Sequence, residues 1–312
     1  MTFDAVMKRA AIGATVDLSL RGIENDPRRS MKNAVDLFGH LTGEIFGESL
    51  MAKIRREAEN PKSCFYRMIT AMVRDVDHAV LKTVGTNMCF NRVGAAAAPA
   101  KPPEPRGPVD LPGAVRRARA KGIYFFVVCG KRPLRYAEEL FAVCRENRDC
   151  AFYLTADAGE VSEDLADRTM RAGNIILAVR IDTDVEPNRI TAGCSRAFEI
   201  LKRKRCLYGY IAKISSAAAK LCCSNAFIDC MAKYGCLFGW YYAGKAKDRA
   251  ACRQAIARLM DSALISRIRP LLLLDPVSDR AICSRFVTGG RCYLIYTRKR
   301  MAVRFSVAPP SP

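Results

Sequence analysis

The residues Ile123-Tyr124-Phe125-Phe126-Val127-Val128-Cys129 form one of the longest apolar runs of the chain. A run of this length, rich in aromatic and β-branched side chains, predicts a buried strand. A helical pattern follows near Tyr136 to Glu146, and a second apolar run occupies Ala151 to Thr155. A strand, a helix and a strand at this spacing predict two parallel strands joined by a crossover helix.

The same alternation continues toward the C-terminus. Further strands are expected at Ile175 to Ile181, Leu207 to Ile214, Leu237 to Tyr242 and Leu271 to Leu274, and helices near Ser162 to Arg171, Ala192 to Lys204, Ala226 to Lys233 and Asp248 to Ala263. Six strands separated by helices predict an α/β fold with a parallel sheet. The count favours an incomplete TIM-type (β/α) barrel, although the pattern alone leaves a three-layer sandwich open.

In such folds the chemistry lies at the carboxyl ends of the strands. The segments that follow the expected strands are Cys129 to Pro133, Thr155 to Asp157, Asp182 to Asp184, Ser215 to Ser216 and Ala243 to Lys245. We therefore expect any functional site among these residues.

The composition divides the chain into four parts. Residues 1–93 have a helical pattern, with Asp26-Pro27 and Asn60-Pro61 as expected helix starts. Residues 94–112 are rich in alanine and proline and predict a linker. Residues 113–275 hold the expected partial barrel, and residues 276–312 form a C-terminal extension.

The chain is strongly basic, with 51 Lys and Arg against 31 Asp and Glu and a formal net charge of +20. Such a charge attracts nucleic acid or an anionic surface, so a polyanion is one alternative partner. The basic residues are spread over many segments without interleaved aromatic side chains, which does not favour a base-stacking platform. No apolar run reaches the roughly 18 residues of a membrane span, and no signal peptide is evident, so we expect a cytoplasmic protein.

The 14 cysteines are expected to be reduced thiols, because disulfide frameworks belong mainly to secreted domains. No Cys-x-x-Cys pair occurs, and the adjacent Cys222 and Cys223 do not match a metal-ligand spacing. Most of them are interpreted as small buried hydrophobic residues. His40 and His78 are the only histidines, and neither has a further ligand at metal-binding spacing, so surface or capping roles are expected for both.

A longer stretch around the first strand is similar to a known family. Val127-Val128-Cys129-Gly130-Lys131-Arg132-Pro133-Leu134 resembles the second strand of radical SAM enzymes, which ends in a Gly-Gly-Glu-Pro-Leu loop. Other segments resemble one branch of that superfamily, which has a helical N-terminal extension and a C-terminal region for an extra cluster: Leu165-Ala166-Asp167, Gly173-Asn174, Ala197 to Lys204, Phe227-Ile228-Asp229 and Gly289 to Leu294. The resemblance covers most of the chain outside the linker.

The chain departs from the family pattern at the places where the family binds its cofactors. Family members carry a Cys-x-x-x-Cys-x-x-Cys loop after the first barrel strand, and its thiolates hold a four-iron cluster. Here the Ala/Pro-rich linker stands in that place, so the first strand and the cluster loop are both expected to be missing. The helix near Pro112 to Ala120 then becomes the first barrel helix, and the edge of the next strand is left open. No cysteine follows Cys292, so the extra cluster cannot be completed either.

The resemblance implies cofactor-binding positions at Gly130, Lys131, Arg132, Pro133 and Asp182. Asp182 stands where the family has an acidic residue facing the nucleoside, although an Asp that caps the following turn is an equal interpretation. Lys131 and Arg132 replace the second glycine and the glutamate of the family loop. A like charge within about 4 Å of the SAM ammonium group costs about 1 to 4 kcal/mol, so we expect the loop to repel SAM.

The sequence therefore predicts a radical-SAM-like protein that has lost cluster and SAM chemistry, with no metal ligands assigned and no cofactor expected. One alternative is an active enzyme that keeps a 4Fe-4S cluster and S-adenosylmethionine with displaced ligands, for instance Cys129, Cys222 and Cys223. A second alternative is a basic protein that binds nucleic acid or an anionic surface. A decayed reading frame is a further interpretation of an open sheet edge, although the N-terminal helices or the linker could cover that edge instead.

Overall fold

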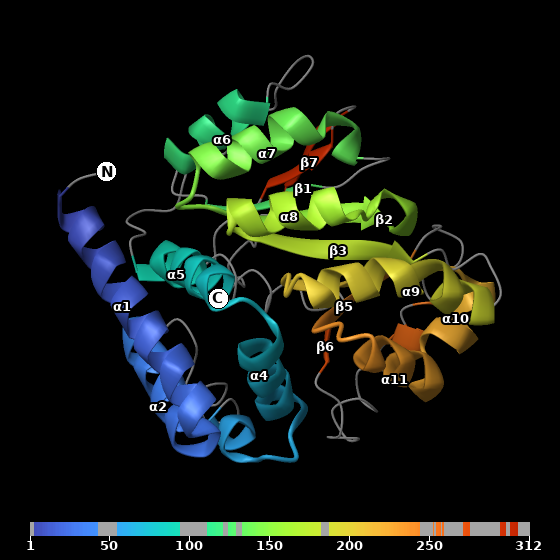
Figure 1. Ribbon diagram of the computed structural model, residues 1–312, viewed down its shortest axis with the longest axis horizontal. Coiled ribbons are helices and arrows are strands. Elements are labelled where there is room, and N and C mark those ends of the chain that lie inside the picture. The colour runs from blue at the N-terminus through green and yellow to red at the C-terminus, as the bar shows by residue number, and fades with distance from the viewer. Residues whose placement is uncertain are drawn as a thin grey trace, which may run out of the picture.

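A computed structural model describes residues 3–42, 55–93, 111–120, 124–128, 133–181, 187–243, 252, 254–256, 258, 271–274, 294–297 and 300–304. These residues form an α/β fold with one large sheet. Figure 1 shows the N-terminal helices at one side of this sheet and a row of later helices in front of its strands. None of the described helices combines the length and the apolar character needed to cross a membrane.

The first six strands all run parallel. They are β1 (Phe125–Val128), β2 (Ala151–Asp157), β3 (Ile175–Ile181), β4 (Tyr208–Ile214), β5 (Phe238–Ala243) and β6 (Leu272–Leu274). Each strand pairs with the next one in sequence, so their order in the sheet is β6-β5-β4-β3-β2-β1. The predicted α/β fold with six parallel strands is confirmed.

Two strands near the C-terminus extend the sheet beyond β1. Strand β7 (Leu294–Thr297) pairs parallel to β1, with Phe126 opposite Leu294, and β8 (Arg300–Arg304) pairs antiparallel to β7. The sequence analysis expected the edge of β1 to be open because the preceding strand is missing. That expectation was wrong, since β7 occupies this edge. Among the described residues the sheet does not close on itself, and its outermost strands are β6 and β8.

Six helices cover one face of the sheet, here called the outer face. They are α6 (Leu111–Ala120), α7 (Ala137–Glu146), α8 (Glu163–Ala172), α9 (Pro187–Arg203), α10 (Ser216–Cys222) and α11 (Asn225–Lys233). Their apolar sides bury one large core against alternate strand residues such as Phe152, Leu177 and Tyr210, which are fully buried. Local signals set the helix ends: Ser162 caps α8 through Leu165 N, and Gly173 ends it with φ +74°.

The N-terminal helices cover part of the opposite face, here called the inner face. They are α1 (Phe3–Asn25), α2 (Pro27–Thr42), α4 (Cys64–Asp75) and α5 (His78–Val93), and residues 55–59 are helical as well. Val76, Val80 and Val84 bury against inner-face residues of β1, β2 and β5. The expected helix start at Asp26-Pro27 is confirmed, since Asp26 accepts from Arg29 N at 3.4 Å at the start of α2. The expected start at Asn60-Pro61 was wrong, because α4 begins at Cys64 and its N-cap is Ser63.

The sheet is strongly curved toward the inner face. Tyr153 of β2 and Trp240 of β5 stack with ring centroids 4.1 Å apart, although β3 and β4 lie between their strands. Three strand spacings of about 4.8 Å span about 14 Å on a flat sheet, so the two rings meet because the sheet bends. Small residues permit this approach: Ala178 lies between them on β3, and a Cβ on Gly209 would lie 2.7 Å from the Phe238 ring.

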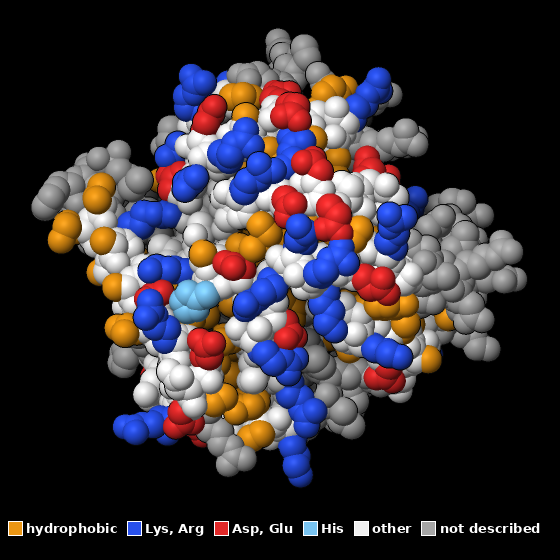
Figure 2. All heavy atoms as spheres, viewed as in Figure 1, with side chains coloured by type: hydrophobic (Ala, Val, Ile, Leu, Met, Phe, Trp, Pro, Cys, Tyr) orange, Lys and Arg blue, Asp and Glu red, His pale blue; other side chains and the backbone are white. Residues whose placement is uncertain are grey.

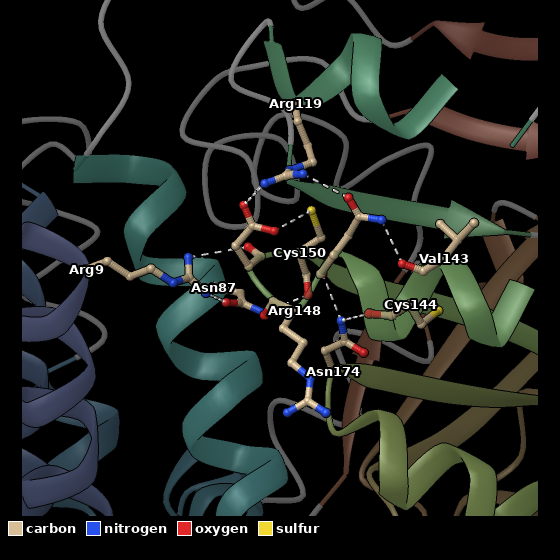
Figure 3. A network of polar contacts seen from close by, with 10 residues as sticks. Arg9, Asn87, Arg119, Val143, Cys144, Arg148, Cys150 and Asn174 are labelled. Carbon is tan, nitrogen blue, oxygen red and sulfur yellow. Dashed lines mark hydrogen bonds and ion pairs between the residues drawn. The ribbon is translucent and has the colours of Figure 1, made fainter. Parts of the chain in front are cut away.

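A buried polar network joins the N-terminal helices to the amino ends of the strands (Figure 3). Asn87 of α5 is 1% exposed, and its Nδ2 donates to Arg148 O at 3.0 Å and to Cys150 O at 2.6 Å, while its Oδ1 accepts from Arg9 of α1. From the outer layer, Arg119 of α6 forms an ion pair with Asp149. The turn before β2 is therefore held from both faces.

Candidate functional site

Three polar side chains gather on the inner face at the carboxyl ends of β2 and β3. Asp157, the last residue of β2, lies beside Arg180 of β3 in the strand register. Arg180 Nε lies 3.2 Å from Asp157 Oδ1, and Arg180 Nη2 donates to Thr155 Oγ1 at 3.5 Å. Thr155, Asp157 and Arg180 thus form one connected group, here called the carboxyl-end cluster.

Local sequence fixes the position of Asp157. The chain turns directly after β2 into a short 3-10 helix, η3 (Ala158–Glu160), and Asp157 is its N-cap. Glu160 Oε2 accepts from Asp157 N at 2.9 Å, and the Asp157 side chain accepts from the Glu160 backbone, which forms a capping box. The cap and the ion pair together leave the Asp157 carboxylate little freedom to rotate.

The cluster is only partly exposed to solvent. Thr155 is 2% exposed, whereas the side chains of Arg180 and Asp157 are 26% and 41% exposed. A partly exposed ion pair contributes little to stability, of the order of 1 kcal/mol or less. A partly exposed guanidinium is a good partner for a carboxylate or a phosphate, because its donors have a fixed planar arrangement.

Several aromatic side chains lie on the inner face of the sheet, on β2 and β5. Tyr153, two residues before Thr155 on β2, is 2% exposed and stacks on Trp240 at 4.1 Å and against Phe238 at 5.8 Å. Further toward the amino ends, α4 and α5 bury the same face. The N-terminal helices therefore cover the amino half of the inner face, and the cluster lies in the carboxyl half.

Thiols occupy the opposite side of the sheet. All nine cysteines whose side chains the structure describes belong to the outer core or pack against it: Cys144, Cys150, Cys194, Cys206, Cys222, Cys223, Cys230, Cys236 and Cys252. Burial raises the pKa of Cys206, Cys222 and Cys223 to about 12, and it raises the pKa of Cys236 well above its ordinary value. These side chains are neutral thiols at physiological pH, and the thiolate is the form that binds metal.

Two of the three cysteines proposed as displaced iron-sulfur ligands, Cys222 and Cys223, lie at the outer core. Cys222 is the last residue of α10, and its carbonyl accepts from Tyr241 Oη within the outer core. Cys223 packs against the same core, and Cys129 lies outside the described residues. Within the described part of the chain, no three His, Cys, Asp or Glu side chains are arranged to hold a metal ion.

The residues assigned to cofactor binding from the family resemblance lie largely outside the described residues. This applies to Gly130, Lys131, Arg132 and Asp182. Pro133 begins the 3-10 helix η2 (Pro133–Tyr136), which leads into α7. Of the segments expected at the strand ends, Thr155 to Asp157 contributes to the cluster, and Ser215 caps α10 by accepting from Ala218 N.

Arg180 was not singled out from the sequence, although a signal exists. It is the only charged residue in the strand Ile175–Ile181, whose other six residues are apolar. Lys and Arg are almost never buried unless they are paired. A cation in a strand that is otherwise apolar therefore indicates a polar neighbour on the same face.

A second concave region lies on the outer side. It is a groove of about 820 Å³ between the start of α8 and the side of α9, bordered by Ser162, Glu163, Arg196, Glu199 and Arg203. Arg203 forms an ion pair with Glu163 across it. Arg203 and Glu163 thus satisfy each other, which makes this groove a weaker candidate than the carboxyl-end cluster.

The chain was compared with protein families, curated proteins and solved structures. No family model matches the chain, and no curated protein and no solved structure is similar to it.

Proposed function

We propose that this chain is a radical-SAM-like protein with a partial β/α barrel, which has lost cluster and SAM chemistry and acts by binding a small molecule at the carboxyl-end cluster. The consecutive order of six parallel strands and the strong curvature of the sheet support a barrel origin. Helices on the outer side of every described crossover fit the same architecture.

The observation that carries the proposal is the separation of thiols from the inner face. An iron-sulfur enzyme of this fold needs thiolates at the carboxyl ends of the strands, on the side where substrate binds. The nine described cysteines are all associated with the outer core, and Thr155, Asp157 and Arg180 occupy the inner carboxyl edge. This arrangement suits polar recognition better than redox chemistry.

Arg180 and Asp157 define the class of ligand. A guanidinium that is paired with one carboxylate can accept a second anionic group on its open side, and the carboxylate can accept a donor from the same ligand. We therefore expect a small polar molecule that carries a carboxylate or a phosphate. Thr155 is buried and the Asp157 carboxylate is held by its cap and its ion pair, so binding rather than turnover is proposed.

The proposed loss of the cluster is tested by iron and acid-labile sulfide content after anaerobic reconstitution. We expect no stoichiometric iron and no absorbance band of a 4Fe-4S cluster. A stoichiometric cluster together with SAM cleavage would overturn the proposal and support the active-enzyme alternative. The same preparation, treated with a chelator, provides the baseline for adventitious iron.

The proposed site is tested by thermal unfolding in the presence of a panel of small carboxylates and phosphate esters. A ligand that binds the folded chain raises the midpoint by mass action, and Arg180→Gln should abolish that rise. Arg117→Gln, at an exposed position of α6, is the matched control and should leave it unchanged. Equal responses in both variants would exclude Arg180 as a ligand contact.

The polyanion alternative is less well supported. Figure 2 shows Lys and Arg side chains interspersed with Asp and Glu over the helices on the visible face, not collected into one basic patch. Several of these cations are paired: Lys204 contacts Glu163 and Asp167, and Arg168 contacts Glu138. Weak retention on heparin at moderate salt is therefore expected.

A further inference from the structure

The guanidinium of Arg180 and the indole of Trp240 converge on two neighbouring positions of β2. Arg180 Nη2 reaches Thr155 Oγ1 from β3, and Trp240 stacks on Tyr153 from β5. Tyr153 and Thr155 are two residues apart, so they point to the same face of the sheet and lie about 6.6 Å from each other along the strand. A cation and an aromatic ring therefore stand next to each other on the inner face.

The strand register agrees with this placement. Arg180 pairs with Ile211 of β4, and Ile211 pairs with Trp240 of β5, so the three residues form one row across the sheet. Ile211 packs against the inner core and is half-buried. The row thus places an apolar side chain between the cation and the ring.

Both groups remain partly accessible. The Arg180 side chain is 26% exposed, and Trp240 is half-buried although Tyr153 covers one face of its ring. Trp240 Nε1 is buried and has no hydrogen-bond partner within the described part of the chain. Buried indole N–H groups usually find an acceptor. A small rotation of the indole would bring this N–H group to an acceptor atom of a ligand.

We propose that the ligand of the carboxyl-end cluster is an aromatic anion, that is, a planar ring that carries a carboxylate or a phosphate. This inference rests on the binding function proposed above and adds the ring to it. The anionic group pairs with the accessible donors of Arg180. The ring packs against Ile211 and against the indole of Trp240.

Two properties of the site select such a ligand. Contacts between aromatic rings are favourable beyond the apolar area that they bury, by a factor of about two to ten in affinity for each pair. The short separation of the two positions on β2, about 6.6 Å, suits a ring that bears its anionic group directly. Asp157 holds the guanidinium in place through the contact of 3.2 Å with Arg180 Nε.

Trp240 is the only tryptophan of the chain, so its fluorescence reports on this site. The intact chain is titrated with benzoate and with cyclohexanecarboxylate, which has the same charge and a similar size but no aromatic ring. We expect benzoate to bind about threefold more tightly or better, and to quench or shift the tryptophan emission. Phenyl phosphate and cyclohexyl phosphate form the corresponding pair for a phosphate head group.

The outcomes separate this inference from the proposed function. Equal affinities within both pairs, with binding that Arg180→Gln abolishes and Arg117→Gln does not, would refute the aromatic ring and leave the binding function intact. Arg180-dependent binding without any change in tryptophan emission would refute it as well. If none of the four compounds binds in a way that depends on Arg180, the inference and the proposed binding site both fail.

Substitutions at Trp240 test the ring contact itself. Trp240→Leu should remove the preference for the aromatic member of each pair, whereas Trp240→Phe, which keeps an aromatic ring, should retain it. Binding to these variants is followed by the thermal unfolding midpoint, and urea unfolding verifies that they fold. A folded Trp240→Leu variant that keeps the full preference would exclude the indole as a ligand contact. If neither variant folds, the paired titrations of the intact chain decide.

Discussion

At the scale of single residues, Asn87 is tightly constrained by its surroundings. It is buried, and its amide connects Arg9 on one helix with two backbone carbonyls of the turn before β2 (Figure 3). A buried amide that satisfies three partners at once cannot be replaced by an apolar residue without removing all three of these hydrogen bonds. Asn87 therefore fixes the N-terminal helices on the sheet more firmly than its size suggests.

Asn87→Ala is expected to lower the free energy of unfolding by about 3 kcal/mol, since two carbonyls and one guanidinium lose a buried partner. The measurement is urea unfolding followed by circular dichroism. Asn33→Ala on α2, where the side chain is exposed, should change it by less than about 0.5 kcal/mol. A loss below about 1 kcal/mol at Asn87 would show that water replaces the amide at little cost.

The buried thiols predict an alkaline limit to stability. Cys206 and Cys222 have their pKa raised by burial from 9.0 to about 12, so the folded chain holds their protons more tightly than the unfolded chain. Their contribution to stability is complete below about pH 9 and is lost as the pH rises toward 12. The urea midpoint should thus fall progressively above pH 9. Cys206→Ala should make this fall less steep, and a midpoint independent of pH would contradict the burial of these thiols.

At the scale of secondary-structure elements, the contact between β4 and β5 depends on glycine. A Cβ on Gly209 would lie 2.2 Å from Phe238 O and 2.7 Å from its ring. Backbone atoms of a paired strand cannot move away easily, so Gly209→Ala should lower the free energy of unfolding by about 2 kcal/mol or more. Gly159→Ala is the matched control, because nothing lies within 4 Å of its added Cβ. Equal unfolding midpoints for the two variants would contradict the close packing at Gly209.

The sequence predicted the six parallel strands because each is a short apolar run between helical patterns, and such patterns are local. It did not predict β7, because Leu294 to Thr297 pairs with a strand that lies far earlier in the chain. Alternation of apolar and polar residues says which segments are strands, but not which ones are neighbours. The edge predicted to be open was therefore misjudged.

The candidate site was predictable only in part, for the same reason. Thr155 to Asp157 was expected at a strand end and lies there. Its partner Arg180 depends on the register between β2 and β3, which no local pattern encodes. The start of α4 shows a smaller error: Asn60 caps a turn through Lys62 N, and Ser63 is the helix cap, because two capping residues compete within four positions.

At the scale of the whole molecule, the C-terminal strands stabilise the sheet by covering β1. Removal of residues 276–312 would expose the unpaired edge of β1, whose four residues are all buried. Exposed apolar edges pair with other chains, so the truncated chain should aggregate and should unfold at lower urea concentration than the full chain. Light scattering and urea unfolding measure the two effects. A truncated chain that remains monodisperse would show that β7 is dispensable.

The placement of the N-terminal helices against the inner face has a consequence for synthesis of the chain. Residues 3–93 leave the ribosome before any of the strands that they cover, and Arg9 contacts a residue 140 positions later. Their apolar sides therefore stay uncovered until residues 125–240 have been made, which takes about 7 to 30 seconds at ordinary elongation rates of about 5 to 20 residues per second. During that interval the nascent helices depend on each other, or on a chaperone, to stay soluble.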